Sequence, residues 1–409
     1  MKEIVNKAYR FRIYPDEEQK VFLAKHFGCT RFIYNYLLDK RSSAWKKEKR
    51  NIGGAEAKRM ISPLKKEKGK EWLKEPNSQS LQAASINLDK AFKKFFKKEA
   101  SYPKFKKKND RQSFEVPQNF QVDAQNNFIK IPKLSTAINT VYHRSLKKIK
   151  KICYLTLSKE PSGKYYVSMN VEEEIVHRRP VAKITKRTKA VGIDLGLKDF
   201  LVESNGQKVT SPKYLRSTEK KLKREQRKLS KKSKGSKNRY KQRQIVAKIH
   251  EKIRHQRHDF LHKQSFRLVR ENQVIFVEDL NVKGMMKNRH LSKSIADAGW
   301  GEFTRQLKYK AQWFGSVIFQ IGRFEPSSKL CSTEGCDFKH TKDSLKLSDR
   351  EWRCPWCNTL HDRDINAAMN IEAIGRVASK SRPVEKSTSA PSERKVQVDS
   401  LKQESLSSS

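Results

Sequence analysis

Three acidic residues in the second half of the chain stand at the ends of segments that predict buried secondary structure. Asp194 ends the apolar run 191–193, and Glu278 ends the apolar run 274–277. Asp364 stands near the start of a predicted helix. A buried carboxylate is costly unless a positive partner meets it, and a divalent cation is such a partner. Mg²⁺ or Mn²⁺ suits three carboxylates because these ions prefer oxygen ligands. Two such ions roughly 4 Å apart can activate a water and stabilise the leaving oxygen in phosphodiester hydrolysis.

Two of these acids have a neighbour that competes for the same role. Asp279 follows Glu278 directly, and Asp362 precedes Asp364 by two residues. Taken singly, a strand-end acid can be a surface charge, and an acid at a helix start can be a cap. The order strand–Asp, strand–Glu, helix–Asp makes a shared catalytic role the better interpretation.

Four of the six cysteines form two close pairs late in the chain: Cys331, Cys336, Cys354 and Cys357. Four thiolates in two such pairs can close a tetrahedral Zn²⁺ site, a structural kind of site with no open position for water. His340 and His361 are alternative ligands. The other two cysteines stand alone, which argues against a disulfide framework and for a metal site in a reducing cytoplasm.

The chain carries a large excess of positive charge. Its 409 residues include 91 Lys and Arg against 44 Asp and Glu, a formal net charge of +47, which favours a polyanionic partner. No apolar run reaches membrane-spanning length, and no basic helix carries a large apolar face, so we expect nucleic acid and no membrane. The expected phosphate contacts are basic residues of two helical regions: Lys94, Lys97, Lys104, Lys106, Lys221, Arg224, Lys231 and Lys232.

The hydrophobic pattern divides the first part of the chain into β and helical segments. Residues 8–14 alternate as in a strand, and the apolar spacing then becomes helical to about residue 48 and again over 81–95. Residues 113–171 return to a period of two with hairpin turns, which is typical of a small barrel or sandwich. Because one strand precedes the helices and the others follow them, we expect the helices to be an insertion in one β domain.

Residues 213–272 predict a long basic helical pair joined by a loop at 230–236. Cationic faces outside an apolar seam suit a nucleic-acid duplex, with a solvated helical hairpin as the alternative. The seam is expected to combine leucines seven residues apart with isoleucines four apart: Leu215, Leu222, Leu229, Ile245, Ile249 and Ile253.

A series of motifs runs through the second half of the chain: Asp194-Leu-Gly, Val277-Glu-Asp-Leu280, Gly299-Trp-Gly-Glu-Phe303, Pro326-Ser-Ser, the cysteine pairs and His361-Asp-Arg-Asp-Ile-Asn-Ala-Ala. In this order they resemble the TnpB family, which consists of transposon-encoded, OrfB-type RNA-guided DNA endonucleases related to CRISPR type V effectors. The resemblance covers nearly the whole chain and is most specific from 191 to 371. By motif position it places the catalytic, metal-binding acids on Asp194, Glu278 and Asp364.

The resemblance implies a multidomain α+β fold. Residues 281–295 suit a mobile flap over the catalytic acids, with a plain surface loop as the alternative. The implied domains are a β-barrel wedge domain over 1–15 and 110–185, a helical recognition lobe over 16–109, a RuvC-like RNase H fold nuclease domain over 190–325 and 360–375, an inserted zinc ribbon over 326–359, and a disordered tail over 376–409.

The resemblance also implies partners. These are a guide RNA from the transposon end and a target double-stranded DNA cut beside a short transposon-associated motif, with Mg²⁺ or Mn²⁺ in the nuclease site and a structural Zn²⁺. Gln82 matches a position that the family uses near that motif. Guide pairing would supply sequence specificity, and one protein monomer with one RNA is the expected assembly. A strand-transfer transposase or accessory protein, and a guided DNA-binding repressor with a dead nuclease centre, are the alternatives.

Overall fold

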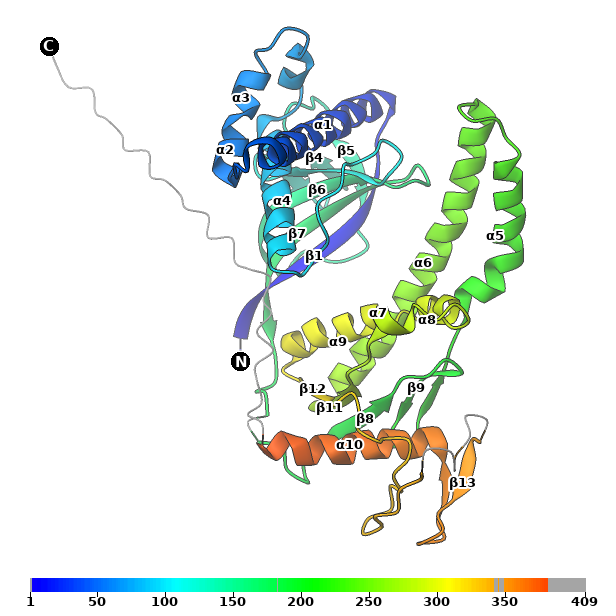
Figure 1. Ribbon diagram of the computed structural model, residues 1–409. Coiled ribbons are helices and arrows are strands. Elements are labelled where there is room, and N and C mark those ends of the chain that lie inside the picture. The colour runs from blue at the N-terminus through cyan, green and yellow to red at the C-terminus, as the bar shows by residue number, and fades with distance from the viewer. Residues whose placement is uncertain (1, 182, 342–344, 346–348, 382–409) are drawn as a thin grey trace, which may run out of the picture. The chain divides into compact units, whose positions relative to one another are not determined.

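The computed structural model describes residues 2–181, 183–341, 345 and 349–381 (Figure 1). The chain divides into two compact units. The first contains Met1–His177 and Lys213–Asp259, and the second contains Arg178–Pro212 and Phe260–Ser409. Across the described residues, no helix combines the length and apolar character that crossing a bilayer requires.

The first unit is built on a seven-stranded antiparallel sheet in the order β2-β6-β7-β1-β5-β4-β3. The first strand of the chain lies between β7 and β5, so the helices that follow it are an insertion in one sheet, as the sequence predicts. The strands are β1 Lys2–Tyr14, β2 Gln112–Val116, β3 Gln121–Asp123, β4 Phe128–Lys130, β5 Ile138–Val141, β6 Ile149–Lys159 and β7 Tyr165–Val176.

The sequence pattern predicted a small barrel or sandwich, and the resemblance implied a β-barrel; the sheet is open and does not close into a barrel. Strands β2 and β3 form its two edges, and no pairing joins them in the described part of the chain. Helices α1 and α4 contact β2 instead, and Leu23 and Phe27 of α1 fill the core beside Phe11 and Val167. Apolar helical side chains therefore cover the concave face that a closed barrel would have filled from its own strands.

The inserted helices form a second core of their own. Helix α1 begins with a capping box in which Asp16 and Gln19 satisfy each other's backbone N–H groups. Asn77 caps α4 by accepting from the Gln79 N–H, and its own N–H donates to the buried ring of His26. The helical elements are α1 Glu17–Glu48, α2 Gly54–Arg59, α3 Ile61–Leu64, the short 3₁₀ helix Glu71–Lys74 and α4 Ser78–Phe96.

Helices α5 (Tyr214–Ser230) and α6 (Lys237–Glu271) form the predicted basic hairpin, but its seam differs from the prediction. Val246 is buried with Ile249 and Ile253, whereas Ile245 is 43% exposed. An α-helix has 3.6 residues per turn, so residues spaced strictly four apart do not stay on one face. Val246, three residues before Ile249, therefore lies on the same face as Ile249. Prediction of the seam at Ile245 was wrong by one position.

The hairpin also belongs to a different unit from the one we expected. Residues 213–259 fall in the unit of the seven-stranded sheet and not with the nuclease range 190–325. Polar contacts join the hairpin to the sheet within this unit: Glu251 of α6 accepts from the Tyr166 hydroxyl at 2.9 Å and lies 3.0 Å from the Lys164 ammonium. Charge pairing of this long-range kind has no local sequence signature.

The second unit contains a five-stranded mixed sheet in the order β10-β9-β8-β11-β12. Strands β8, β9 and β10 are antiparallel neighbours, whereas β11 runs parallel to both β8 and β12. The strands are β8 Ala190–Asp194, β9 Asp199–Glu203, β10 Lys208–Thr210, β11 Val274–Glu278 and β12 Val317–Ile321.

Helices cover both faces of this sheet (Figure 1). The end of α6 and the helices α8 (Ser292–Ala298) and α9 (Trp300–Phe314) bury one face, with Leu268, Ile295 and Phe303 in the core. Helix α10 (Arg363–Ser381) contacts β8, β9, β11 and β12 on the other face, where Phe276 and Ile371 are buried together. The sheet is therefore the central layer of three.

The predicted tail and the predicted flap are both partly helical in the structure. Residues 376–381 continue α10, so the expected disordered tail cannot begin at 376; Arg376 anchors this turn by donating to the Thr185 and Thr188 carbonyl oxygens. The rest of the predicted tail, 382–409, lies outside the described residues. The proposed flap contains the short helix α7 (Val282–Met285) and the first part of α8.

Candidate metal-dependent nuclease site

Asp194 and Glu278 come from the ends of neighbouring parallel strands. Val277 is paired with Ile193 in the register of β11 and β8, so the next residue of each strand is one of the two acids. Because parallel strands have their carboxyl ends at the same end of the sheet, both carboxylates lie at that end. The sequence pattern predicted an acid at the end of each strand, and the strand pairing brings these two ends together.

Asp364 reaches the same region because α10 packs unusually close to β8. A Cβ atom on Gly192 would lie 2.2 Å from the Ala368 carbonyl oxygen, and one on Gly375 would lie 2.1 Å from the Phe276 ring. Only glycine leaves room for the helix at these two points. Asp364 lies in the first turn of that helix, and its charge acts on Asp194.

The hydrogen bonds separate each acid from its neighbour. Asp362 caps α10 by accepting from the Asp364 and Ile365 N–H groups, and it pairs with the Lys208 ammonium at 2.5 Å. Asp279 pairs with Arg323 at 2.5 Å. These structural roles of Asp362 and Asp279 support the choice of Asp364 and Glu278 as the acids of the site.

The electrostatics of Asp194 indicate a site that needs a cation. Burial, with the nearby negative charges of Glu278 and Asp364, raises the pKa of Asp194 to about 7. The positive groups near the acids include Arg350, which lies 3.6 Å from Asp364, and Arg363, whose charge acts on Asp194. The Ser327 hydroxyl donates to Glu278 at 2.6 Å. A carboxyl whose pKa is raised by burial and by neighbouring negative charges ionises readily once a divalent cation binds beside it. The donor set therefore fits Mg²⁺ or Mn²⁺.

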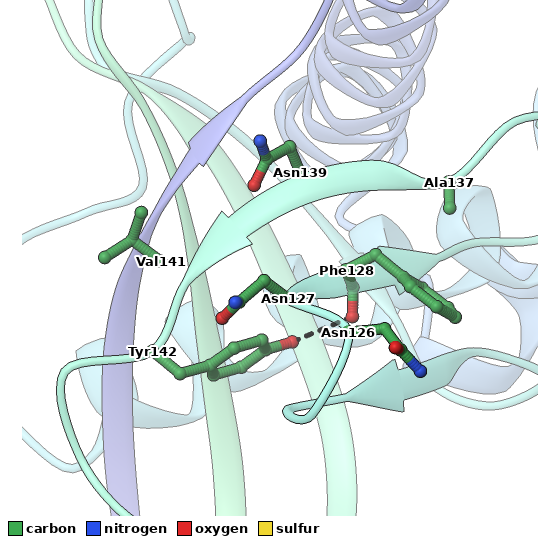
Figure 2. A pocket seen from close by; sticks show the side chains of 7 residues that line it. All are labelled: Asn126, Asn127, Phe128, Ala137, Asn139, Val141 and Tyr142. Carbon is green, nitrogen blue, oxygen red and sulfur yellow. Dashed lines mark hydrogen bonds between the residues drawn. The ribbon is translucent and has the colours of Figure 1, made fainter.

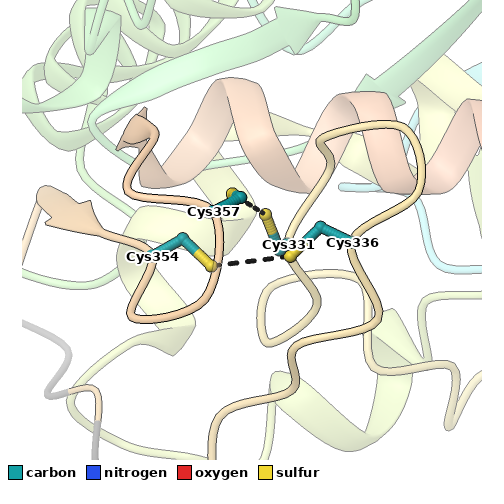
Figure 3. A group of neighbouring side chains, drawn as sticks. All are labelled: Cys331, Cys336, Cys354 and Cys357. Atoms are coloured by element: carbon teal, nitrogen blue, oxygen red, sulfur yellow. Dashed lines mark hydrogen bonds between the residues drawn. The ribbon is translucent and has the colours of Figure 1, made fainter.

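The four predicted cysteine ligands lie together (Figure 3). Their sulfur atoms are all within 4.8 Å of one another, and among the described residues these cysteines are the one group of three or more potential ligands at such a spacing. The three acids are thus less tightly gathered than the thiols. Two of the sulfur–sulfur distances are 3.6 Å for Cys331 to Cys357 and 3.7 Å for Cys336 to Cys354.

The cysteine group fits Zn²⁺ by its geometry and its chemistry. Hydrogen bonding to the Thr359 and Thr333 hydroxyls lowers the pKa of Cys357 to about 5, so a thiolate is already favoured there. His361, which we considered as a ligand, places Nε2 3.1 Å from the Cys331 sulfur and stacks near Trp352. Four thiols complete a tetrahedral set, and His361 then supports Cys331 from outside it. The strands β13 (Glu351–Arg353) and β14 (Leu360–Asp362) carry the second pair into α10.

Asn366 and Asn370, which the sequence analysis did not single out, join α10 by hydrogen bonds to residues 327–332, the segment that contains Cys331. Asn366 donates to the Leu330 carbonyl oxygen at 2.8 Å and accepts from the Ser332 N–H at 2.9 Å. Asn370 donates to the Ser327 and Leu330 carbonyl oxygens, both at 2.8 Å. The signal in the sequence was the spacing of Asn366 and Asn370, which stand four residues apart on the buried side of α10 that also carries Ala367. Both side chains are buried, and they fix the helix that carries Asp364.

The predicted nucleic-acid contacts have varied surroundings. Lys106 lies over the Tyr34 ring at 4.1 Å, and burial lowers its pKa. Arg224 pairs with the buried Glu225, Gln82 is half-buried, and Lys232 is half-buried. The remaining members are exposed: Lys94, Lys97, Lys104, Lys221 and Lys231.

Two surface hollows contrast in chemistry. One of about 390 Å³ on α5 is lined by cations, including the predicted Arg224 and Lys231. The other, of about 500 Å³ in the seven-stranded sheet, is lined by the neutral side chains of β4, β5 and their flanking turns (Figure 2). Neither contains a catalytic acid. The first hollow has the charge expected of a phosphate-binding surface.

The fold is similar to that of a solved Cas12f1 protein. The chain matches the structure described as "Cryo-EM structure of the Cas12f1-sgRNA-target DNA complex" with a TM-score of 0.55 and 13% sequence identity. The match covers 90% of this chain and 98% of the other chain. Fold and site together define a multidomain α+β protein with a curled open sheet, a fold similar to that of Cas12f1, a group of three carboxylates and a four-cysteine cluster.

Sequence comparison identifies the family. Three family descriptions match: "Probable transposase" of the OrfB type found in IS605 elements over 166–289, an associated "Helix-turn-helix domain" over 1–50, and a "Cas12f1-like, TNB domain" over 300–371. The structure contains a strand and one long helix in 1–50, not a helix-turn-helix.

Two curated relatives match almost end to end. A Streptomyces pristinaespiralis protein named "Putative RNA-guided DNA endonuclease" is 38% identical over 93% of this chain and 92% of its own length. The Escherichia coli K12 protein "Putative RNA-guided DNA endonuclease InsQ" is 29% identical over 90% of this chain and 92% of its own length. This chain belongs to the TnpB family, as its sequence motifs predicted.

Proposed function

We propose that this protein is an RNA-guided, divalent-metal-dependent DNA endonuclease of a transposable element. The observation that carries the proposal is the placement of Asp194 and Glu278 on adjacent parallel strands, with Asp364 on the helix packed against them. The names of the two relatives and the nucleic acids in the Cas12f1 complex agree with that chemistry. The mixed sheet flanked by α10 supports assignment as a RuvC-like domain.

Each acid has a defined role in this proposal. Asp194, Glu278 and Asp364 would hold Mg²⁺ or Mn²⁺, which when bound supplies water activation and stabilisation of the leaving oxygen in phosphodiester hydrolysis. Ser327 orients Glu278 through its 2.6 Å hydrogen bond, and Asp362 fixes the start of α10. Lys208 holds Asp362 in turn.

The first unit and the basic hairpin would hold nucleic acid. Guide RNA from the transposon end and target double-stranded DNA are the proposed partners, with the sheet as a wedge and helices α1 to α4 as a recognition lobe that includes Gln82. Guide pairing would supply the sequence specificity, and the protein would read the duplex by shape and backbone charge. Cys331, Cys336, Cys354 and Cys357 would bind a structural Zn²⁺.

The deciding experiment expresses the protein with its flanking genomic DNA and sequences the nucleic acid that copurifies. A single structured RNA with a variable 3′ segment is the expected result, and it supplies the target for a cleavage assay with Mg²⁺. Element-end DNA alone, or random cellular RNA, would favour the strand-transfer transposase. A guided complex that binds its target without cutting would favour the repressor.

A further inference from the structure

An aromatic cluster at the end of α4 has no part in the site described above. Its rings belong to Phe92, Phe95, Phe96 and Tyr102, which we call the aromatic ledge. Phe95 lies 5.4 Å from Phe96 and 5.2 Å from Tyr102, and Phe92 lies 6.2 Å from Phe96 in a stacked orientation. The four rings therefore form one continuous surface.

The ledge is exposed on one side and anchored on the other. Phe96 is 66% exposed and Tyr102 is 44% exposed, whereas Phe92 is buried. The Tyr102 hydroxyl is hydrogen-bonded to the Ser42 hydroxyl at 2.7 Å, and the Arg41 guanidinium lies 4.1 Å from the centre of the Phe92 ring. An apolar surface that is exposed to water is typical of a binding site, because no contact within the protein compensates for the cost of its exposure.

Exposed lysines stand next to the ledge in the sequence. Lys94, Lys97 and Lys98 are exposed, and none of them has an ion-pair partner among the residues that the structure describes. Lys93 is paired with Asp89 at 3.0 Å. Unpaired cations beside open aromatic faces are the combination that holds unpaired nucleotides, since the bases stack on the rings and the phosphates meet the ammonium groups. The interior base pairs of a duplex are already stacked on both faces, so apart from its two ends a duplex offers no base to the rings.

We propose that the aromatic ledge binds unpaired nucleotides by base stacking on Phe96 and Tyr102. This inference deepens the proposed function, on which it rests, by adding a single-strand contact to the phosphate contacts of the recognition helices. Unpaired guide RNA and a displaced DNA strand offer the same chemistry to the ledge. The lysines favour nucleic acid over a second copy of this chain, whose net charge is also strongly positive.

The test measures binding of the full chain to labelled single-stranded RNA, single-stranded DNA and a blunt duplex of equal length. Salt of about 300 mM suppresses binding through phosphates alone. We expect Phe96→Ala and Phe96→Leu to weaken single-strand binding about tenfold, because loss of one stacked base costs that order of affinity, and to leave duplex binding unchanged. Phe96→Trp should retain binding and show fluorescence quenching when the oligonucleotide stacks.

Val21→Ala is the matched control, since Val21 is an exposed apolar side chain on α1 and lies outside the ledge. Preference for the RNA or the DNA oligonucleotide identifies the source of the unpaired strand. Equal loss on the duplex, or no loss for Phe96→Ala, would overturn the inference. A change in oligomeric mass of Phe96→Ala would assign the ledge to a protein contact instead. Cleavage by the wild-type protein is measured separately, so failure of the nuclease proposal is distinguishable from failure of the ledge.

Discussion

Asp194, Glu278 and Asp364 differ in what surrounds each of them. Asp194 is held in a buried, acidic environment, Glu278 receives a hydrogen bond from Ser327, and Asp364 faces Arg350. The raised pKa of Asp194 means that burial of its charge opposes folding of the metal-free protein. Functional sites commonly carry such a cost in stability.

Replacement of Asp194 by Ala should abolish DNA cleavage while RNA and target binding stay nearly intact. The substitution removes a metal ligand and little packing, and the thermal midpoint of the metal-free protein should be unchanged or higher because a buried charge is lost. Asp279→Ala is the control, since its exposed ion pair with Arg323 contributes about 0–1 kcal/mol and cleavage should continue. Loss of RNA binding in Asp194→Ala would contradict the assignment.

The affinity for Mg²⁺ should depend on pH around the raised pKa of Asp194, which is about 7. Below pH 7 the carboxyl is mostly protonated in the metal-free site, so a proton must leave when the cation binds. The apparent affinity should therefore fall about tenfold per pH unit below 7 and level off above it. Calorimetric titration between pH 5.5 and 8.5 measures this slope; a flat profile would mean that Asp194 is already ionised.

At the scale of elements, the contact between α10 and β8 sets the geometry of the site. The contact depends on Gly192, because any side chain there meets the helix backbone. Small residues also line the facing side of α10, where Ala367 and Ala368 are buried. The approach of helix to strand is thus determined by the smallest side chains of both.

Gly192→Ala should displace α10 and reduce cleavage at least tenfold, with a loss of about 1–3 kcal/mol in the free energy of unfolding from overpacking. Gly301→Ala is the matched control, because no atom lies within 4 Å of its Cβ position in α9. That control should be neutral or slightly stabilising, since alanine favours a helix over glycine. Thermal unfolding and a single-turnover cleavage assay measure both quantities.

The seam of the basic hairpin makes a second prediction at this scale. Val246→Ala removes two buried methyl groups and should destabilise the hairpin by about 1–2 kcal/mol, whereas Ile245→Ala should have little effect. Hydrogen exchange of the α5 and α6 amides measures the difference. Faster exchange in the Ile245 variant than in the Val246 variant would return the seam to its originally predicted register.

At the scale of the whole molecule, the excess of positive charge is the main determinant of what the protein binds. A formal net charge of +47 makes self-repulsion large, and a bound polyanion relieves it. The exposed lysines of α4 and α5 lie in the first unit, to which the hairpin also belongs. The proposed RNA should therefore stabilise this unit.

Affinity for the copurified RNA should fall steeply with salt. If 6–10 phosphates are neutralised, raising NaCl from about 50 to 200 mM lowers the affinity on the order of 10³–10⁵-fold through counterion release. Filter binding over this range measures the slope. Lys94→Ala should reduce the slope by about one unit, whereas Lys70→Ala, whose ammonium is already paired with Glu67, should leave it unchanged.

The amino-acid sequence by itself determined much of the candidate site. Apolar runs ending in Asp194 and Glu278, and two close cysteine pairs, are local patterns, and the structure places these residues as those patterns suggest. The insertion of helices between β1 and β2 also followed from periodicity alone. These features are predictable because period and spacing act over a few residues.

Motif position already favoured Asp364 over Asp362 and Glu278 over Asp279, but only the tertiary structure supplied a physical reason for the choice. It gave Asp362 to a helix cap and Asp279 to an ion pair, which leaves Asp364 and Glu278 for the site. It also left the sheet open, buried Val246 in place of Ile245 and grouped the hairpin with the first unit. Each of these outcomes depends on contacts between segments far apart in the chain, where space and charge pairing decide and local propensity does not.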